Sequence, residues 1–437
     1  MWPYYPELLA MPVPRYTSFP TAAEFRGDVG AADFAALLEG ASGDVSLYVH
    51  FPFCQKICWY CGCNTGAANR EQRLIGYLET LHREIALTGE RLPDTAQVTR
   101  ISFGGGSPNA MAPLEFVRLI DALTVHFRIV DPLISIELDP RSFSPDWAEV
   151  IGAIGVTRAS LGVQTFSPRL QEAIGRVQAP ELIADATAAL RSAGVESLNF
   201  DLMYGLPGQT MRDLDETLDR AVELGADRIA LFGYAHVPHI VPRQKRIDAS
   251  ALPDQKQRFD MAAAGFNRLK GQGYVPVGFD HFALPHDPLA LASAEGGLGR
   301  NFQGFTDDRA PVLLGLGASA ISSFPELIVQ NEKNAGRYGM QVARDCFPAE
   351  RGVRRSAEDR RRGEVIAQLL CEGNASLDPE LVDEAATTLA PFIKRGLVVV
   401  EREHCTIAPE GLPYARSIAA RFDPYRQDSL RSFSAAV

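Results

Sequence analysis

The sequence lacks the long apolar run that a membrane-spanning helix requires. No stretch of its 437 residues approaches about 20 consecutive apolar residues. The first ten residues also have no cationic segment followed by an apolar core, which is the pattern of a secretion signal. We therefore expect a cytoplasmic protein that has no membrane partner.

Positive charge is also in short supply. The chain has 43 Lys and Arg against 54 Asp and Glu, which gives a net charge of −11. Nucleic acids and membrane surfaces are themselves anionic, so long-range repulsion argues against either as a partner. Any anionic substrate must then be bound by a local basic pocket.

The cysteines do not have the even, regular spacing of a disulfide-stabilised fold. There are seven cysteines. Four of them fall within ten residues, and the other three are scattered far from this group. A dense group of this kind in a reducing compartment indicates a metal site. The group consists of Cys54, Cys58, Cys61 and Cys63.

Short apolar, β-branched runs alternate with segments of helical periodicity between about residues 46 and 233. This alternation is typical of repeated βα units, in which right-handed crossovers build a parallel sheet. Three helix starts are marked by Pro145, Pro168 and Pro180. We predict an α/β barrel or partial barrel, with chemistry at the carboxyl ends of its strands. The predicted strands are 46–51, 98–104, 133–139, 156–163, 195–202 and 227–233, and 275–280 is a candidate for a further strand.

Three regions are predicted along the chain. Residues 1–45 contain a Pro-rich, aromatic segment that is typical of an extended arm, followed by a short helix. Residues 46–343 hold the barrel and a substrate-binding extension. Residues 344–437 show two helices, a hairpin and a last helix, which is the outline of a winged-helix module. The acidic composition favours a structural role for this C-terminal domain over DNA binding.

The strongest functional signal is HFPFCQKICWYCGC at residues 50–63, directly after the first strand. Its first three cysteines have C-x3-C-x2-C spacing, which suits a 4Fe-4S cluster because each thiolate can bind a different iron and leave the fourth iron open. Structural zinc is the alternative, but it takes four ligands, usually as two separated pairs. We predict Cys54, Cys58 and Cys61 as the cluster ligands. Cys63 is a candidate fourth ligand, but it lies so close to Cys61 that we expect it to have a separate role near the active site.

Glycine and polar residues stand at the carboxyl ends of the next predicted strands. The segment 104–108 lets the backbone approach a ligand closely and offer amide donors, with an ordinary βα turn as the alternative. Paired carboxylates on one rim suit a ribose and a cationic sulfonium, with solvated strand ends as the alternative. The candidates on this rim are Glu137, Gln164, Arg176 and Asp201.

A set of motifs runs from the N-terminal arm to residue 305. They are PRYTSFPTA (14–22), YVHFPFC (48–54) with the cysteine motif that it opens, GGGSP (104–108), DLMYGLPGQT (201–210), YAHVP (234–238), GFDHFA (278–283) and RNFQGF (300–305). In combination they resemble the oxygen-independent coproporphyrinogen III oxidases of the radical S-adenosylmethionine superfamily. The resemblance covers nearly the whole chain, and no single later motif would be sufficient.

The resemblance implies a partial (β/α)6 TIM-like barrel of the radical S-adenosylmethionine type, with an N-terminal arm and a small, mostly helical C-terminal domain. The implied reaction is the oxidative decarboxylation of two propionates of coproporphyrinogen III to vinyl groups, which gives protoporphyrinogen IX in anaerobic heme biosynthesis. The implied cofactors are a 4Fe-4S cluster and two molecules of S-adenosylmethionine. The reaction also needs an electron donor and an electron acceptor, which the sequence does not identify, and we expect the protein to be a monomer.

Site residues follow from the resemblance, position by position. Cys63 and Tyr48 are expected to take part in catalysis, and Cys63 is typical of the decarboxylating members. Gln303 is expected to bind the second S-adenosylmethionine, although Phe305 stands where the family motif usually ends in Tyr, just as Trp59-Tyr60 replaces the more common Tyr-Phe. The expected contacts to S-adenosylmethionine are Tyr48, Tyr60, Gly105, Gly106, Ser107, Glu137, Gln164, Arg176, Asp201, Ala235, Gln303 and Ile321.

Two kinds of relative on the same scaffold are alternative interpretations: a heme-trafficking protein and an anaerobic heme-degrading radical enzyme. Both usually lack a counterpart of Cys63 and the arm motif at 14–22, so the presence of both features favours the decarboxylating enzyme. Its substrate has four carboxylates and needs cationic donors. The candidates, each with solvated surface charge as the alternative, are Arg15, Arg243, Lys245, Arg246 and Arg300.

Overall fold

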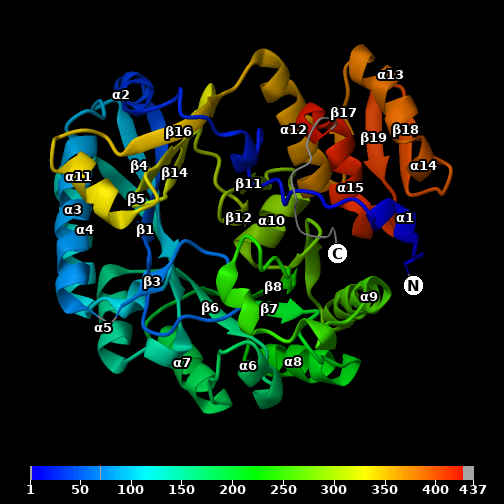
Figure 1. The fold of residues 1–437 in the computed structure, drawn as a ribbon, viewed down its shortest axis with the longest axis horizontal. Helices are drawn as coiled ribbons and strands as arrows, with labels where there is room; N and C mark the ends of the chain where they lie inside the picture. Colours follow the sequence, from blue (N-terminus) through cyan, green and yellow to red (C-terminus); the bar gives the residue numbers. More distant parts are fainter. Residues whose placement is uncertain (1, 69, 427–437) are drawn as a thin grey trace.

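A twelve-stranded sheet forms the centre of the computed structural model, which describes residues 2–68 and 70–426 (Figure 1). Seven of its strands lie side by side and run parallel. The sheet stays open, because antiparallel strands continue it at both edges, so the predicted α/β partial barrel is confirmed. In spatial order the parallel strands are β13 (Val312–Leu316), β1 (Gly43–Phe51), β4 (Ala96–Gly105), β5 (Ile129–Leu138), β6 (Arg158–Gln164), β7 (Ser197–Tyr204) and β8 (Arg228–Gly233).

Six of the seven parallel strands match predicted strands, and β13 is the one that sequence analysis misses. Residues 234–311 lie between β8 and β13 and form several elements. The strand–helix–strand pattern that marks the other parallel strands is therefore absent before β13. This segment contains α9 (Gln255–Gly271), α10 (Pro288–Ala294) and the hairpin of β11 (Gly299–Asn301) and β12 (Gly304–Thr306).

Antiparallel strands extend both edges of the sheet. Beside β8 lie β10 (His281–Ala283) and β9 (Val275–Val277), so only the first half of the candidate strand 275–280 is a strand. Beside β13 lie β14 (Ile321–Ser323), β15 (Leu327–Asn331) and β16 (Ala349–Arg354), with α11 (Ala335–Val342) between the last two. Strand β16 belongs to the large sheet although it follows the expected boundary at residue 343. The three-part division of the chain stays a prediction.

Helices cover the outer side of the parallel strands (Figure 1). The helix starts at Pro145, Pro168 and Pro180 are confirmed. The Ser144 side chain caps α5 by accepting a hydrogen bond from the backbone N–H of Trp147, and Thr210 caps α8 in a capping box with Asp213. The helices of this layer are α3 (Glu71–Gly89), α4 (Pro113–His126), α5 (Pro145–Ile154), α6 (Pro168–Ala173), α7 (Pro180–Ser192) and α8 (Met211–Glu223).

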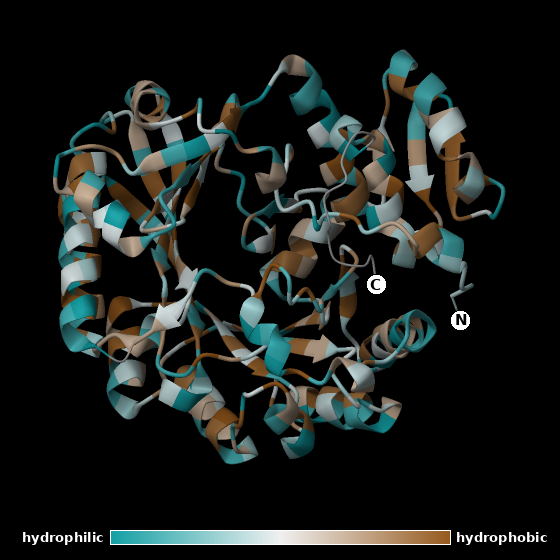
Figure 2. Cartoon of the chain, viewed as in Figure 1, coloured by the Kyte–Doolittle hydropathy of each residue, from teal (hydrophilic) through white to brown (hydrophobic). Residues whose placement is uncertain are grey.

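The core lies between these helices and the sheet, where hydrophobic residues gather (Figure 2). Leu161, Leu198, Phe200 and Ile229 on the central strands are fully buried. A sheet covered by helices reads as nearly continuous apolar strands, so a polar residue on such a strand is an exception that needs a reason. The exceptions at the carboxyl ends of the strands form the site described below. None of the helices in the described ranges is long and apolar enough to cross a membrane.

The N-terminal arm contains α1 (Pro6–Leu9) and α2 (Ala31–Glu39) and contacts the C-terminal region. The backbone N–H of Tyr5 donates to the Tyr414 hydroxyl at 2.8 Å, and the Tyr16 hydroxyl donates to Asp423 at 3.0 Å. Arg395 forms an ion pair with Glu7 at 2.6 Å. The two ends of the described chain therefore stabilise each other against the open side of the barrel.

The C-terminal region packs helices on a small three-stranded sheet. Its helix at 357–372 and its hairpin are confirmed. The second predicted helix is divided into two, because Pro391 lacks a backbone N–H and stands in the first turn of a new helix. The elements are α12 (Ala357–Glu372), β17 (Asn374–Ser376), α13 (Pro379–Thr388), α14 (Ala390–Ile393), β18 (Val398–Glu401), β19 (His404–Ile407) and α15 (Ala415–Ala419).

Candidate active site

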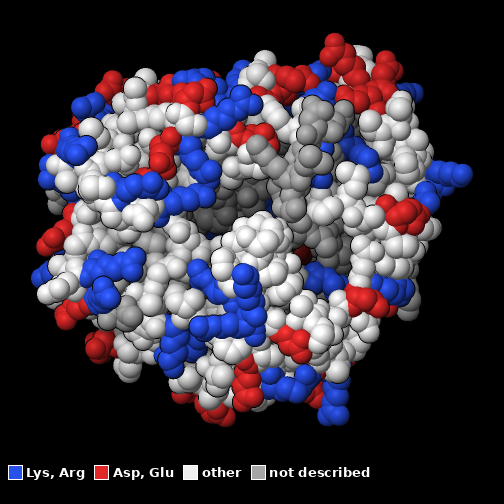
Figure 3. Space-filling model, viewed as in Figure 1, with Lys and Arg blue, Asp and Glu red and all other residues white. Residues whose placement is uncertain are grey.

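The four clustered cysteines line one cavity of about 490 Å³ at the carboxyl ends of the barrel strands. Cys54 ends β2 (Phe53–Cys54), which pairs in parallel with β3 (Gly66–Ala67) and so closes the base of the cysteine loop. Within the described ranges, no three His, Cys, Asp or Glu side chains meet as they would on a single metal ion. Lys and Arg side chains surround a hollow in the face shown in Figure 3.

The cysteine loop is held from two sides. On one side the backbone N–H of Trp59 donates to the carbonyl of Ile174 at 3.0 Å. Next to it, Gly175 has a φ of +66°, and a Cβ on it would lie 2.6 Å from the Trp59 ring. On the other side the Gln244 side chain donates to the carbonyl of Tyr60 at 2.9 Å. These contacts fix the loop before any ligand binds.

Two arginines contact the thiol of Cys58. Arg141 and Arg176 donate to its Sγ at 3.3 and 3.2 Å, and both pair with Asp139, at 2.6 and 3.3 Å. Burial by itself would raise the pKa of Asp139, but Arg176 and Arg141 outweigh it and hold that pKa below its usual value. Two cationic donors therefore reach the Cys58 sulfur, and hydrogen bonds to the sulfurs around a cluster tune its reduction potential.

Sequence analysis identifies Arg176 but misses Asp139 and Arg141. The available signal is their position, because Asp139 follows β5 directly and Arg141 lies in the short 3₁₀ helix η3 (Pro140–Ser142) after it. The rule that singled out Glu137 therefore applies equally to these two residues. The contact of Arg141 with Cys58, which lies 83 residues away in the sequence, has no local signature.

Cys61 and Cys63 interact with each other. The thiol of Cys63 is hydrogen-bonded to Cys61, and this bond is the largest cause that lowers the pKa of Cys61, to about 6. The same bond raises the pKa of Cys63 well above its usual value. In this pair Cys63 therefore acts as the donor and Cys61 as the acceptor.

The glycine segment after β4 packs tightly against the end of β1. Gly105 has a φ of +105°, and a Cβ on it would lie 2.3 Å from the His50 ring. The backbone N–H groups of Gly105, Gly106 and Ser107 all donate within the protein, and their expected contact with a ligand stays a prediction. Gly105 donates to Glu137 Oε2 at 3.2 Å, and Gly106 and Ser107 donate to the carbonyls of Phe51 and Phe53 at 2.8 Å. The glycines instead permit this close approach.

Two half-buried carboxylates, those of Glu137 and Asp201, face the cavity from β5 and β7. Burial raises the pKa of Glu137 to about 7, and the charge of Asp201 adds to the shift. Burial also raises the pKa of Asp201, although Asn199 and Ser160 donate to it at 2.8 and 3.1 Å. Between them, Gln164 ends β6 in the left-handed region, with a φ of +67°. Because a nearby cation favours ionised carboxylates, this part of the cavity suits a cationic ligand.

Most of the predicted site residues line this cavity, and three do not. Tyr48 lies outside the lining and its hydroxyl bonds to His50 Nδ1 at 3.2 Å. Ile321 is on β14 and Gln303 is exposed in the turn of the β11–β12 hairpin. The predicted residues in the lining are Cys54, Cys58, Tyr60, Cys61, Cys63, Gly105, Gly106, Ser107, Glu137, Gln164, Arg176, Asp201 and Ala235.

Comparison with known proteins identifies the family of the chain. The Radical SAM superfamily model matches residues 48–221. The chain is 41% identical to the oxygen-independent coproporphyrinogen III oxidase of Bradyrhizobium diazoefficiens over 97% of both chains, and 37% identical to that of Escherichia coli over 96% of this chain and 94% of the relative. The solved structure of coproporphyrinogen III oxidase from Escherichia coli, described as a radical SAM enzyme, superposes with a TM-score of 0.91 and 35% identity over 97% of this chain and 99% of that one.

Proposed function

The chain belongs to the oxygen-independent coproporphyrinogen III oxidases, a family of radical S-adenosylmethionine enzymes, and we propose that the cysteine-lined cavity is where it acts. The enzyme converts two propionates of coproporphyrinogen III to vinyl groups and so produces protoporphyrinogen IX in anaerobic heme biosynthesis. The observation that carries the proposal is that residues from five strand ends and the cysteine loop line one cavity.

The thiols of Cys54, Cys58 and Cys61 would hold the 4Fe-4S cluster, and the fit rests on their chemistry. All three line the cavity, and the guanidinium groups of Arg141 and Arg176, which contact the Cys58 sulfur, would offset the negative charge of a bound cluster. With S-adenosylmethionine, a reduced cluster of this kind supplies a 5′-deoxyadenosyl radical. Cys63 is hydrogen-bonded to Cys61, and we propose that it supports the cluster without being one of its ligands.

The carboxylates would position S-adenosylmethionine. Its sulfonium and ammonium groups are cations, and Glu137 and Asp201 are half-buried acids without an ion-pair partner in the described part of the chain. The sulfonium and ammonium groups, once bound, would favour the ionised forms of both carboxyls. Gln164 and the tightly packed segment at Gly105 complete the wall around this position.

Each decarboxylation removes one hydrogen atom from the carbon β to the carboxylate, then carbon dioxide and one electron, and leaves a carbon–carbon double bond. The protein holds the propionate close to the site of hydrogen removal and restricts access of water to the reactive carbon. The electron passes to an acceptor that is a separate partner, as is the electron donor. We also propose that the protein acts as a monomer in the cytoplasm, without nucleic-acid or membrane partners, a view that its net charge of −11 supports.

We infer that two molecules of S-adenosylmethionine bind. The RNFQGF motif supports this inference, since Gln303 and Ile321 lie outside the first cavity and are free to serve another. Equilibrium dialysis of the reconstituted enzyme should give a stoichiometry of two per chain, falling towards one in Gln303→Ala. A stoichiometry of one in the wild type would refute the second site.

The test of the main proposal is anaerobic reconstitution with iron and sulfide, followed by dithionite, S-adenosylmethionine and coproporphyrinogen III. Vinyl product should accumulate with loss of carbon dioxide. Porphyrin binding without conversion, in protein with a complete cluster, would instead favour a trafficking role.

A further inference from the structure

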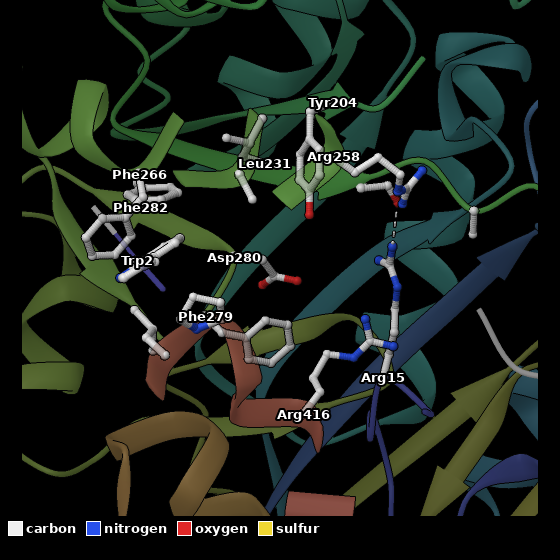
Figure 4. Close-up of a pocket in the computed structure, with 15 residues that line it drawn as sticks. Trp2, Arg15, Tyr204, Leu231, Arg258, Phe266, Phe279, Asp280, Phe282 and Arg416 are labelled. Atoms are coloured by element: carbon white, nitrogen blue, oxygen red, sulfur yellow. Dashed lines mark hydrogen bonds between the residues drawn. The ribbon is translucent and has the colours of Figure 1, made fainter. Parts of the chain in front are cut away.

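A second, smaller cavity of about 70 Å³ adjoins the cysteine-lined cavity (Figure 4). The two cavities share Arg15, Gly233 and Ala235 in their linings. Trp2, Phe266 and Phe282 form one wall, whereas Arg15 and Arg416 point into the space from another, with Asp280 between the two groups (Figure 4). We call this cavity the arginine pocket. Its walls come from the N-terminal arm, the barrel and the C-terminal region.

Arg15 carries a charge that no carboxylate of the described chain neutralises by an ion pair. Its guanidinium donates a long hydrogen bond of 3.4 Å to the carbonyl of Gly233 and lies 5.0 Å from the centre of the Phe232 ring. Asp280 is the one acid among the described residues of the lining, and it is hydrogen-bonded to His281 Nδ1 at 2.7 Å. The contacts of Arg15 with Gly233 and with the Phe232 ring do not use all five N–H donors of its guanidinium.

Three further guanidinium groups stand close to Arg15, those of Arg258, Arg300 and Arg416. Arg416 donates to the backbone carbonyl of Val13 at 2.6 Å, and Arg300 donates to the backbone carbonyls of Arg15 and Tyr16 at 3.0 and 3.1 Å. The Nη1 of Arg300 is buried and has no hydrogen-bond partner in the part of the chain that the structure describes. Burial lowers the pKa of Arg416 to about 9, and the charges of Arg15 and Arg300 add to the shift. Like charges are thus packed together, which is costly unless an anion joins them.

The size of the pocket limits the anion. A volume of about 70 Å³ has room for roughly five water-sized groups, whereas a tetrapyrrole ring is far larger. A carboxyethyl arm has three carbons and two oxygens and so matches this room. Its methylene carbons would lie along the aromatic wall, and its carboxylate would face the arginines.

We propose that the arginine pocket binds the carboxylate of one propionate of the tetrapyrrole, with Arg15 as its principal donor. This inference rests on the proposed function. Because Arg15 lines both cavities, a propionate held there anchors the ring while a neighbouring propionate occupies the cysteine-lined cavity. The anchored carboxylate offsets the excess of positive charge, and it fixes which carbon is presented for hydrogen removal.

The experiment measures binding to the reconstituted enzyme by quenching of porphyrin fluorescence. The probes are coproporphyrin III and its tetramethyl ester, which has the same ring but no free carboxylate. Arg15→Gln should weaken binding of the acid about tenfold or more and change binding of the ester little. Arg15→Lys should restore part of the affinity, since it returns the charge without the fork. The control is Arg212→Gln, an exposed arginine on α8 whose side chain is 88% accessible.

Equal affinity of wild type and Arg15→Gln for the acid would overturn the proposal, and so would an equal loss for acid and ester. If Arg15→Gln does not fold, the wild type decides: the acid must bind more tightly than the ester and lose affinity with rising salt. Cluster content and vinyl formation are measured on the same wild-type sample. Selective acid binding in a wild type that forms no product would contradict the proposed function and leave the arginine pocket standing.

Discussion

The two ends of the barrel strands carry similar charged residues and use them in opposite ways. At the amino end, Arg158 begins β6 and donates to both carboxylate oxygens of Asp307 at 2.7 Å. Although burial opposes it, hydrogen bonds from Arg158 and Arg100 hold the pKa of Asp307 well below its usual value. At the carboxyl end, Glu137 and Asp201 have raised pKa values and no ion-pair partner in the described ranges.

The difference shows how one fold separates stability from function. A largely buried acid that is clamped by two arginines is costly to remove, and it leaves no unpaired charge for a ligand to bind. An acid or an arginine without an ion-pair partner destabilises the protein slightly and favours the binding of a ligand of opposite charge. The amino end should therefore respond to substitution in stability, and the carboxyl end in cofactor content, turnover and affinity.

The largest expected effect at the carboxyl end is loss of the cluster. Cys58→Ala removes a predicted ligand and should abolish iron and sulfide binding and the air-sensitive absorption of the reconstituted protein. Cys371→Ala is the control, because Cys371 is buried in α12 of the C-terminal region. Iron analysis and the absorption spectrum check the result. A normal cluster in Cys58→Ala would contradict the ligand assignment.

Cys63 should separate cluster content from turnover. Cys63→Ala removes the donor to Cys61 but no predicted ligand, so iron, sulfide and the electron-resonance signal of the reduced cluster should persist. Vinyl formation should be lost, because hydrogen bonds at the cluster tune its electron transfer. Both are measured on one sample, together with Cys63→Ser, which keeps a donor. Lost iron would make Cys63 a ligand, and full turnover would make it a packing residue.

At the amino end, Asp307→Ala should lower the free energy of unfolding by about 3–5 kcal/mol, because it leaves two largely buried arginines unpaired. Asp219→Ala, which breaks a half-exposed pair with Arg268 on the barrel surface, should cost about 1 kcal/mol or less. Denaturant unfolding of both variants checks the comparison. Similar losses would mean that the amino-end cluster has no special role in stability.

The pH dependence of stability should oppose that of a clamped acid. The folded pKa of Glu137 is raised to about 7 from 4.5, so its contribution is fully present below pH 4.5 and is lost as the pH rises through about 7. In protein without the cluster, wild type should lose about 3 kcal/mol relative to Glu137→Gln between pH 4.5 and 8. Parallel stability curves of the two proteins would show that Glu137 ionises freely.

Much of this could be predicted from the sequence, and the limits have a physical cause. The parallel strands follow from local apolar runs, and the polar residues at their carboxyl ends share a rim because parallel strands end together. The contact of Arg141 with Cys58 and the arginine pocket depend on packing between distant segments: Arg15 reaches a carbonyl 218 residues away. The same limit applies to the amides of Gly106 and Ser107. No local pattern reveals that they donate to the carbonyls of Phe51 and Phe53.

The smallest effect tests whether the unpaired acids await a cation. Asp201→Asn keeps the shape of the side chain and one acceptor oxygen for the donors Ser160 and Asn199, but it removes the negative charge. Cluster content should be unchanged, and the affinity for S-adenosylmethionine should fall about tenfold, the value of one charge-assisted contact. Anaerobic calorimetric titration measures the affinity, with Asp44→Asn at the exposed amino end of β1 as the control.

If the charge of Asp201 serves only the fold, the affinity for S-adenosylmethionine will stay constant while the stability of the protein changes. If it serves the cofactor, removing a half-buried charge that has no ion-pair partner among the described residues will leave the free protein equally or more stable. A gain in stability with a loss of affinity would therefore distinguish the carboxyl end from the amino end in a single residue.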